Sequence, residues 1–149
     1  MNAPKDFREV EVLLVEDDDV DAEATLRAFR KARIANAVYR VRDGVEGLAV
    51  LRGTGAIAIK RPFLVLLDLN LPRMDGIDFL REVRSDPSLA DTLVFVLTTS
   101  DDERDKNAAY ERQVAGYIVK SRAGRDFAEL TELLDHYWRV VEFPPERPQ

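Results

Sequence analysis

The sequence predicts a single α/β domain whose parallel sheet is covered by helices on both faces. Short apolar runs alternate along the chain with segments in which apolar residues recur at helical spacing, and this alternation is typical of βαβ units. The length of 149 residues fits one domain. Several apolar runs end directly in polar residues, and in open α/β sheets ligands bind outside the carboxyl ends of the strands.

The first half of the chain contains two of the expected strand–helix units. A strand is expected at Glu11–Glu16, because its continuous apolar run suits a strand buried on both faces. A helix is expected at Val20–Ala32, with Asp18 or Asp19 as its N-cap. Its apolar positions recur at helical spacing: Ala22, Leu26, Phe29 and Ala32. The next unit is a strand at Val38–Arg42 and a helix at Val45–Arg52.

The second half continues the alternation. A strand at Phe63–Asp68 leads to a helix at Gly76–Ser85, which Asp86-Pro87 should end because a proline disfavours helical backbone in the residue before it. The remaining elements are expected at Leu93–Thr98, Asp102–Gln113, Gly116–Val119 and Arg125–Val141. Five such units suggest a doubly wound sheet. We expect one domain over residues 1–149, with a core at about 10–141 and a Pro-rich C-terminal tail at 142–149.

Composition excludes several classes of protein. Apolar residues make up 46% and charged residues 34%, which is typical of a globular chain. A formal charge of −6 argues against a nucleic-acid surface. No apolar stretch approaches a membrane span, Met1–Pro4 begins no secretory signal, and the absence of cysteine excludes disulfides and thiol catalysis. We expect a cytoplasmic protein.

Four strand ends carry the residues of one predicted site. The polar residues are Glu16-Asp17, Asp68, Thr98-Thr99 and Lys120. Clustered carboxylates repel unless a cation neutralises them, and oxygen ligands without His or Cys suit Mg²⁺, or Mn²⁺ in its place. We expect Asp17 and Asp68 as direct ligands, a backbone carbonyl from Asn70, and Glu16 acting through water. The alternative is that these acids only cap helices, which would not account for the lysine.

Asp68 is also a candidate nucleophile. An aspartyl carboxylate can attack a phosphoryl group to give an acyl phosphate, and phosphoryl transfer needs mainly positioning and charge neutralisation. Thr98 would supply a hydroxyl, with Thr99 as a secondary donor, and Lys120 would pair with the phosphoryl oxygens. Each of these residues alone would be read as an ordinary strand-end or surface residue. Their joint placement favours a site.

The chain resembles the response-regulator receiver domains of two-component signalling over about Glu11 to Val141. The most specific segment is Leu66–Gly76, which is similar to the family's phospho-acceptor segment. The resemblance implies a flavodoxin-like fold with strand order 2-1-3-4-5. It implies that a sensor histidine kinase phosphorylates Asp68, with Mg²⁺ bound at Glu16-Asp17, and that autodephosphorylation is slow. It also implies three residue roles: Thr98 as the switch hydroxyl, Lys120 as the phosphate-pairing cation and Tyr117 as an aromatic switch. Tyr117 could instead be a strand-edge residue that only buries apolar surface and has no switching role. Asn70 and Ser100 would flank the attacking water.

Other features resemble the stand-alone receivers of phytochrome-type sensor kinases. These features are the loop Gly53–Arg61, the segment Leu97–Ser100 and the C-terminal segment Tyr137–Pro145. Because the chain stops at Gln149, we expect a stand-alone receiver, in which phosphorylation changes the surface or a homodimer. The expected dimer contacts are Tyr137, Trp138, Val141 and Phe143. The alternative is that this segment folds back on its own domain.

One departure concerns the residue after the lysine. The family commonly has a proline in a cis peptide there, whereas Lys120 is followed by Ser121. A non-proline peptide prefers the trans form by about 2.5–4 kcal/mol. The bond is therefore either trans, with a different loop geometry, or a strained cis bond.

Three other classes of site or protein fit the sequence less well than a phosphorylated receiver. Asp17, Asp19 and Asp21 alternate as in a calcium loop, but Ala22 and Ala28 occupy the positions that need Gly and Glu. A phosphatase of the haloacid dehalogenase type would need a second Asp where Asn70 stands. A pseudo-receiver, which binds a partner without phosphorylation, would normally have lost an acid or the lysine.

Overall fold

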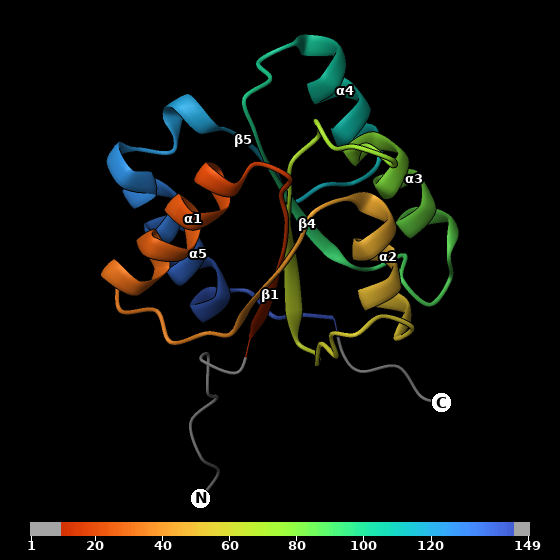
Figure 1. Cartoon of the computed structure of the whole chain (residues 1–149), viewed down its shortest axis with the longest axis horizontal. Helices are drawn as coiled ribbons and strands as arrows, with labels where there is room; N and C mark the ends of the chain where they lie inside the picture. The colour runs from red at the N-terminus through yellow and green to blue at the C-terminus, as the bar shows by residue number, and fades with distance from the viewer. Residues whose placement is uncertain (1–9, 145–149) are drawn as a thin grey trace, which may run out of the picture.

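The computed structural model describes residues 10–144 and contains the predicted parallel sheet, in the order β2-β1-β3-β4-β5. Figure 1 shows α1 (Asp19–Lys31) and α5 (Ala128–Val140) on one face of the sheet and the other three α-helices on the opposite face. The fold prediction is therefore confirmed. The remaining elements are β1 (Glu11–Val15), β2 (Val38–Val41), α2 (Gly44–Arg52), β3 (Phe63–Leu67), α3 (Gly76–Ser85), β4 (Leu93–Thr98), α4 (Glu103–Glu111) and β5 (Gly116–Val119).

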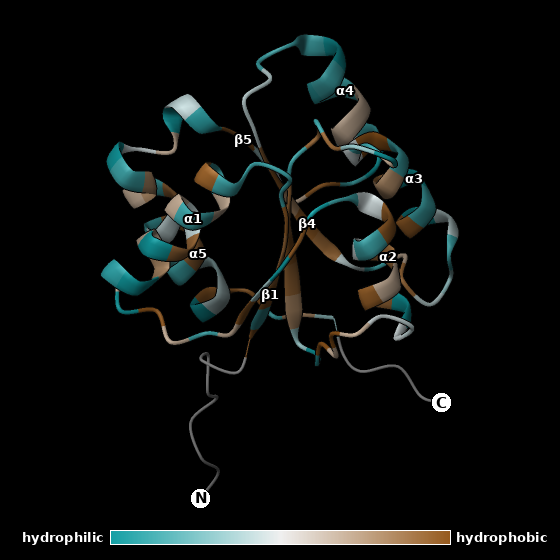
Figure 2. Cartoon of the chain, viewed as in Figure 1, coloured by the Kyte–Doolittle hydropathy of each residue, from teal (hydrophilic) through white to brown (hydrophobic). Residues whose placement is uncertain are grey.

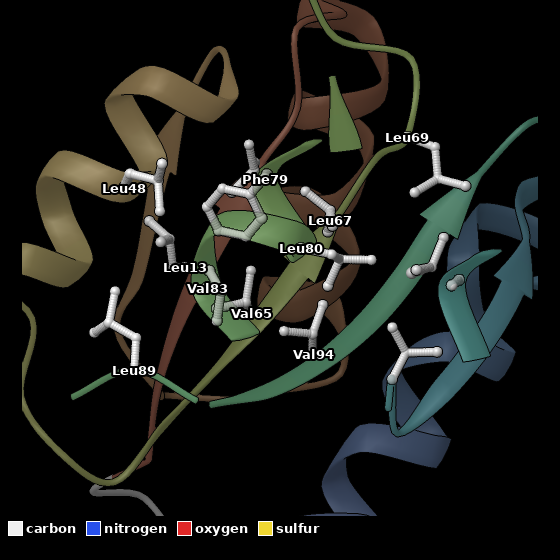
Figure 3. Packing of buried hydrophobic residues seen from close by; sticks show 14 of the residues in the cluster. Leu13, Leu48, Val65, Leu67, Leu69, Phe79, Leu80, Val83, Leu89 and Val94 are labelled. Carbon is white, nitrogen blue, oxygen red and sulfur yellow. The ribbon is translucent and has the colours of Figure 1, made fainter. Parts of the chain in front are cut away.

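Alternate residues of the central strands pack into two separate cores. Val12 and Leu14 of β1 face a cluster under α1 and α5, whereas Leu13 and Val15 face a cluster under α2 and α3. This alternation follows from the period of two residues in a strand. Figure 2 shows apolar residues along the strands and polar residues on the outer sides of the helices, and Figure 3 shows the second cluster, in which Phe79 is fully buried.

Aspartates begin most of the helices. Asp18, Asp43, Asp75 and Asp102 are the N-caps of α1 to α4, and each side chain accepts a hydrogen bond from a backbone N–H in the first turn. The sequence predicted either Asp18 or Asp19 as the N-cap of α1, and the structure has Asp18. Gly76 must be glycine, because a Cβ there would lie 2.6 Å from the Cα of Leu69. This close contact fixes the loop between β3 and α3.

The helices differ from the prediction by more than one residue at two ends. The last helix was predicted from Arg125, but α5 begins at Ala128, because Asp126 and Phe127 adopt left-handed φ values of 53° and 58°. A short 3-10 helix, Arg125–Phe127, takes the place of the predicted first turn. The fourth helix ends at Glu111 rather than Gln113, which also has a positive φ.

The predicted tail 142–149 is described only to residue 144, and residues 145–149 lie outside the described range, as does the segment Met1–Pro4. Between residues 10 and 144, none of the helices is both long enough and apolar enough to cross a membrane.

Candidate functional site

Four polar side chains meet at the carboxyl ends of neighbouring strands. Glu16 follows β1, Asp68 follows β3, Thr98 ends β4, and Lys120 begins a 3-10 helix directly after β5. The parallel registers β1–β3, β3–β4 and β4–β5 bring these strand ends to one edge of the sheet. All four residues are largely buried: the exposed fraction is at most 7% for Glu16, Asp68 and Thr98 and 8% for the lysine side chain.

The Asp68 carboxylate receives three hydrogen bonds. Its Oδ1 accepts from the hydroxyl of Thr98 at 2.8 Å and from the backbone N–H of Asn70 at 3.1 Å. Among residues 10–144, its Oδ2 accepts from Lys120 alone, whose Nζ lies 3.2 Å away. The two oxygens therefore differ, since Oδ1 is held by two donors while Oδ2 faces a single cation.

Lys120 places one positive charge among three carboxylates. Besides Asp68, its Nζ lies 2.6 Å from Glu16 Oε1 and 2.7 Å from Asp21 Oδ2. Burial alone would lower the pKa of Lys120, but the hydrogen bonds that it donates to Asp21 and Glu16 raise the pKa above its usual value. Lys120 therefore stays charged at neutral pH.

Glu16 experiences the opposite balance. Burial raises its pKa, as does the neighbouring charge of Asp68, and the hydrogen bond from Lys120 only partly offsets both effects. The resulting pKa is about 7, compared with an ordinary value of 4.5. Its second oxygen, Oε2, accepts the backbone N–H of Asp18 at 3.2 Å, so both oxygens of the side chain are occupied.

Two contributors were not predicted as site residues. Asp21, in the first turn of α1, was considered only for a calcium loop, yet it binds Lys120. Arg40 of β2 donates to the backbone carbonyls of Glu16 at 2.8 Å and Asp17 at 3.1 Å. Arg40 also contacts Asp19 at 2.9 Å, so it fastens the acidic loop to β2. A basic residue near the end of the neighbouring strand was the available signal for this contact.

The residues predicted to bind a metal ion are divided between two environments. Glu16 and Asp68 are bound to Lys120, whereas Asp17 and Asn70 are exposed. Within residues 10–144, no group of three or more His, Cys, Asp or Glu side chains is arranged to hold a metal ion. In the same range, the carboxylate of Asp17 makes no hydrogen bond. The available donors are all oxygens, which fits a hard divalent cation.

Tyr117 and Ser100 connect β5 to the loop after β4. The hydroxyl of Tyr117 donates to the backbone carbonyl of Ser100 at 2.9 Å, and its half-buried ring packs against the α2–α3 core cluster. The hydroxyl of Ser100 binds Asp105 at 2.5 Å, while the backbone N–H of Ser100 lies 3.4 Å from Thr98 Oγ1. Thr99, by contrast, is exposed. The loop is therefore joined to both Thr98 and Tyr117.

The peptide after the lysine resolves one of the alternatives. Among residues 10–144 the only cis peptide is Arg61-Pro62, so Lys120-Ser121 is trans. The chain enters a short 3-10 helix at residues 120–122. This is the alternative in which the loop after the lysine takes its own geometry.

Trp138, one of the expected dimer contacts, is internal to this chain, which favours the alternative that the segment folds back on its own domain. Trp138 is 2% exposed and packs with Phe29 of α1 at a ring-centroid distance of 6.5 Å. Tyr137 packs edge-on against Phe95 of β4 at 4.9 Å, and Phe143 packs against Tyr137 at 6.1 Å. The segment folds back on its own domain because α5 turns this side toward the sheet. Val141 is half-buried.

An α/β sheet of this order, with an aspartate, a threonine and a lysine in contact at its carboxyl edge, is the architecture of a receiver-type domain. The family model described as "Response regulator receiver domain" matches residues 12–133. The chain belongs to the response regulator receiver family.

Individual relatives match over most of their length. The chain is 37% identical to Response regulator Rcp1 of Synechocystis sp. over 128 residues, which are 85% of this chain and 87% of that protein. The crystal structure of the phosphorylated cyanobacterial phytochrome response regulator RcpA matches with a TM-score of 0.81 at 35% identity, covering 92% of this chain and 99% of RcpA. The Mn²⁺-bound form of Rcp1 matches with a TM-score of 0.79 at 36% identity and the same two coverages.

Proposed function

We propose that Asp68 accepts a phosphoryl group and that this protein relays the signal of a sensor histidine kinase. The observation that carries the proposal is the pair of donors on one carboxylate: Thr98 Oγ1 at 2.8 Å and Lys120 Nζ at 3.2 Å from Asp68. A pseudo-receiver would have no need for both. Phosphoryl transfer depends on such preplaced donors, because charge develops on the equatorial oxygens.

The nucleophilic atom is Oδ2 of Asp68. It has one hydrogen-bond donor whereas Oδ1 has two, so fewer hydrogen bonds must be displaced when it attacks. Oδ2 attacks phosphorus, the new P–O bond forms, and the bond to the donor breaks. A phosphohistidine donor would leave as neutral imidazole once its nitrogen is protonated, and acetyl phosphate would leave as acetate. Lys120 and Thr98 then bind the oxygens of the transferred group.

The carboxylate of Asp17, the carboxylate of Asp68 and the backbone carbonyl of Asn70 would hold the divalent cation, Mg²⁺ or Mn²⁺. When bound, the cation neutralises charge on the phosphoryl oxygens. Glu16 would take part only through water, because Lys120 and the Asp18 N–H occupy its oxygens. Arg40 keeps the loop of Asp17 in place through the two backbone carbonyls.

The output surface would lie over β5 between α4 and α5. Thr98 is joined to the loop that Tyr117 contacts through Ser100, so a phosphoryl group that moves Thr98 would also move Tyr117. A hollow of about 380 Å³ lies beside Tyr117 and is lined by Tyr110 and Leu133. A change at Tyr117 would therefore alter the shape of this surface.

The kinase partner would be of the phytochrome type, and the protein would act in the cytoplasm as a homodimer. The relatives Rcp1 and RcpA support this reading. Because Trp138 is internal, the dimer would have to use the outer side of this region, where Val140 of α5 is exposed and Val141 is half-buried. Phosphotransfer from a bacteriophytochrome kinase, compared with a kinase of another sensory class, would test the partner.

The acceptor is tested by labelling with acetyl phosphate and Mg²⁺. Intact-protein mass spectrometry should detect one added phosphoryl group, and Asp68→Asn should abolish it. Asp78→Asn is the matched control, because Asp78 is an exposed acid of α3 bound to Arg81. Equal labelling of Asp68→Asn and the wild-type protein would contradict the proposal.

A further inference from the structure

We propose that Asp21 is a positioning residue that holds Lys120 on the α1 side of the site and competes with the phosphoryl group for it. The inference deepens the proposed function and rests on it. The Nζ of Lys120 lies 2.7 Å from Asp21 but 3.2 Å from Asp68. Before phosphorylation, the cation is therefore held closer to Asp21 than to the nucleophile.

The protons of Lys120 are fully used in this arrangement. An ammonium group has three protons and no lone pair, and Lys120 has three carboxylate partners, Glu16, Asp21 and Asp68. A phosphoryl group on Asp68 brings several new oxygens to the place where only Oδ2 was bound. To bind them closely, Nζ must move away from one of its two shorter contacts.

Asp21 is the partner that Lys120 can leave. The side chain of Glu16 is 2% exposed, so losing the contact would force this buried carboxyl either to take up a proton or to stay charged without compensation. The side chain of Asp21 is 31% exposed and can be solvated when the contact breaks. Its backbone is fixed in the first turn of α1, because its N–H donates to Asp18 and its carbonyl accepts from Thr25. Asp21 therefore stays in place as an alternative partner for Lys120.

The test uses beryllofluoride, a mimic of the phosphoryl group, with Mg²⁺ saturating for each variant. Calorimetry should show that Asp21→Asn binds beryllofluoride about three- to tenfold more tightly than the wild-type protein, which is the effect of removing one partly exposed competing ion pair. The acyl phosphate formed from acetyl phosphate should likewise accumulate to a higher level. An unchanged or weaker affinity would overturn the proposal.

Two controls separate this role from other effects of the substitution. Glu23→Gln removes the same charge from α1, but Glu23 contacts Arg30 rather than Lys120, so its affinity should equal that of the wild-type protein. In a Lys120→Met background, Asp21→Asn should no longer increase the affinity. A gain that persists without Lys120 would mean that Asp21 acts by simple repulsion, which contradicts the positioning role.

The outcome is distinguishable from failure of the proposed function. If the wild-type protein binds beryllofluoride and Asp68→Asn does not, the acceptor assignment stands whatever Asp21→Asn does. If Asp68→Asn binds as well as the wild-type protein, Asp68 is not the acceptor, and both proposals fail together.

Discussion

Glu16 is a buried carboxylate that must share one lysine with two other acids. Its two oxygens are occupied by Lys120 and the Asp18 N–H, yet its pKa remains raised, to about 7. Ionising Glu16 therefore costs free energy in the folded protein that it does not cost in the unfolded chain. The site is assembled at some expense of stability, as is common where charges are gathered for function.

This balance predicts how stability depends on pH. The folded protein binds the Glu16 proton more tightly than the unfolded chain, so acidification through about pH 7 toward 4.5 should stabilise the fold. In EDTA, lowering the pH from about 7.5 to about 5.5 should raise the free energy of unfolding of the wild-type protein by about 1–2 kcal/mol more than that of Glu16→Gln. Urea denaturation at the two pH values measures the difference. Parallel changes in both proteins would show that Glu16 is not the titrating group.

The contacts of single residues were partly visible in the sequence. Glu16, Asp68, Thr98 and Lys120 were predicted to meet because each lies at a strand end, and parallel strands bring these ends to one edge of the sheet. The contacts of Asp21 and Arg40 were not predicted. Each depends on how far a long side chain reaches across to a neighbouring element, and spacing along the chain carries no information on that reach.

At the scale of elements, α5 is fixed to the sheet by its aromatic residues. Trp138 fills the space between α5 and α1, where it meets Phe29, and Tyr137 covers Phe95 of β4. These contacts pack this side of α5 inside the domain. From the sequence alone, the same side could equally have formed a dimer contact.

Truncating the tryptophan should therefore destabilise the monomer. Trp138→Ala leaves a cavity under α5 and should lower the free energy of unfolding by about 3–5 kcal/mol in urea. Val140→Ala is the control on the same helix, since Val140 is 67% exposed, and should change stability by less than about 0.5 kcal/mol. A loss below about 1 kcal/mol for Trp138→Ala would contradict the internal packing of this side chain.

The strands were predicted to within one residue because continuous apolar runs mark buried parallel strands clearly. The start of α5 and its buried side were not. The turn at Arg125–Phe127 depends on left-handed backbone at Asp126 and Phe127, which those residue types do not signal. Tyr137 and Trp138 are adjacent, so helical spacing alone does not decide which side of α5 the sheet covers.

At the scale of the whole molecule, a ligand that binds only the folded state stabilises the fold by mass action. If Asp17, Asp68 and the Asn70 carbonyl hold Mg²⁺, a Mg²⁺ concentration ten times its dissociation constant should raise the free energy of unfolding by about 1.4 kcal/mol, and EDTA should reverse the gain. Thermal unfolding of the wild-type protein, Asp17→Asn and Glu23→Gln, with and without Mg²⁺, would measure this gain in stability. The gain should be lost in Asp17→Asn and kept in Glu23→Gln; equal gains in all three would exclude Asp17 as a ligand.

The contact between Lys120 and Glu16 joins residues that are 104 positions apart. A chain emerging from the ribosome presents Glu16 and Asp68 long before Lys120 has been synthesised. Until β5 and the turn after it are made and have docked, Asp68, the proposed acceptor, lacks its contact with Lys120. A nascent or truncated chain without Lys120 should therefore not be phosphorylated at Asp68. The capacity to receive a signal would then arise only after the last part of the sheet has been completed.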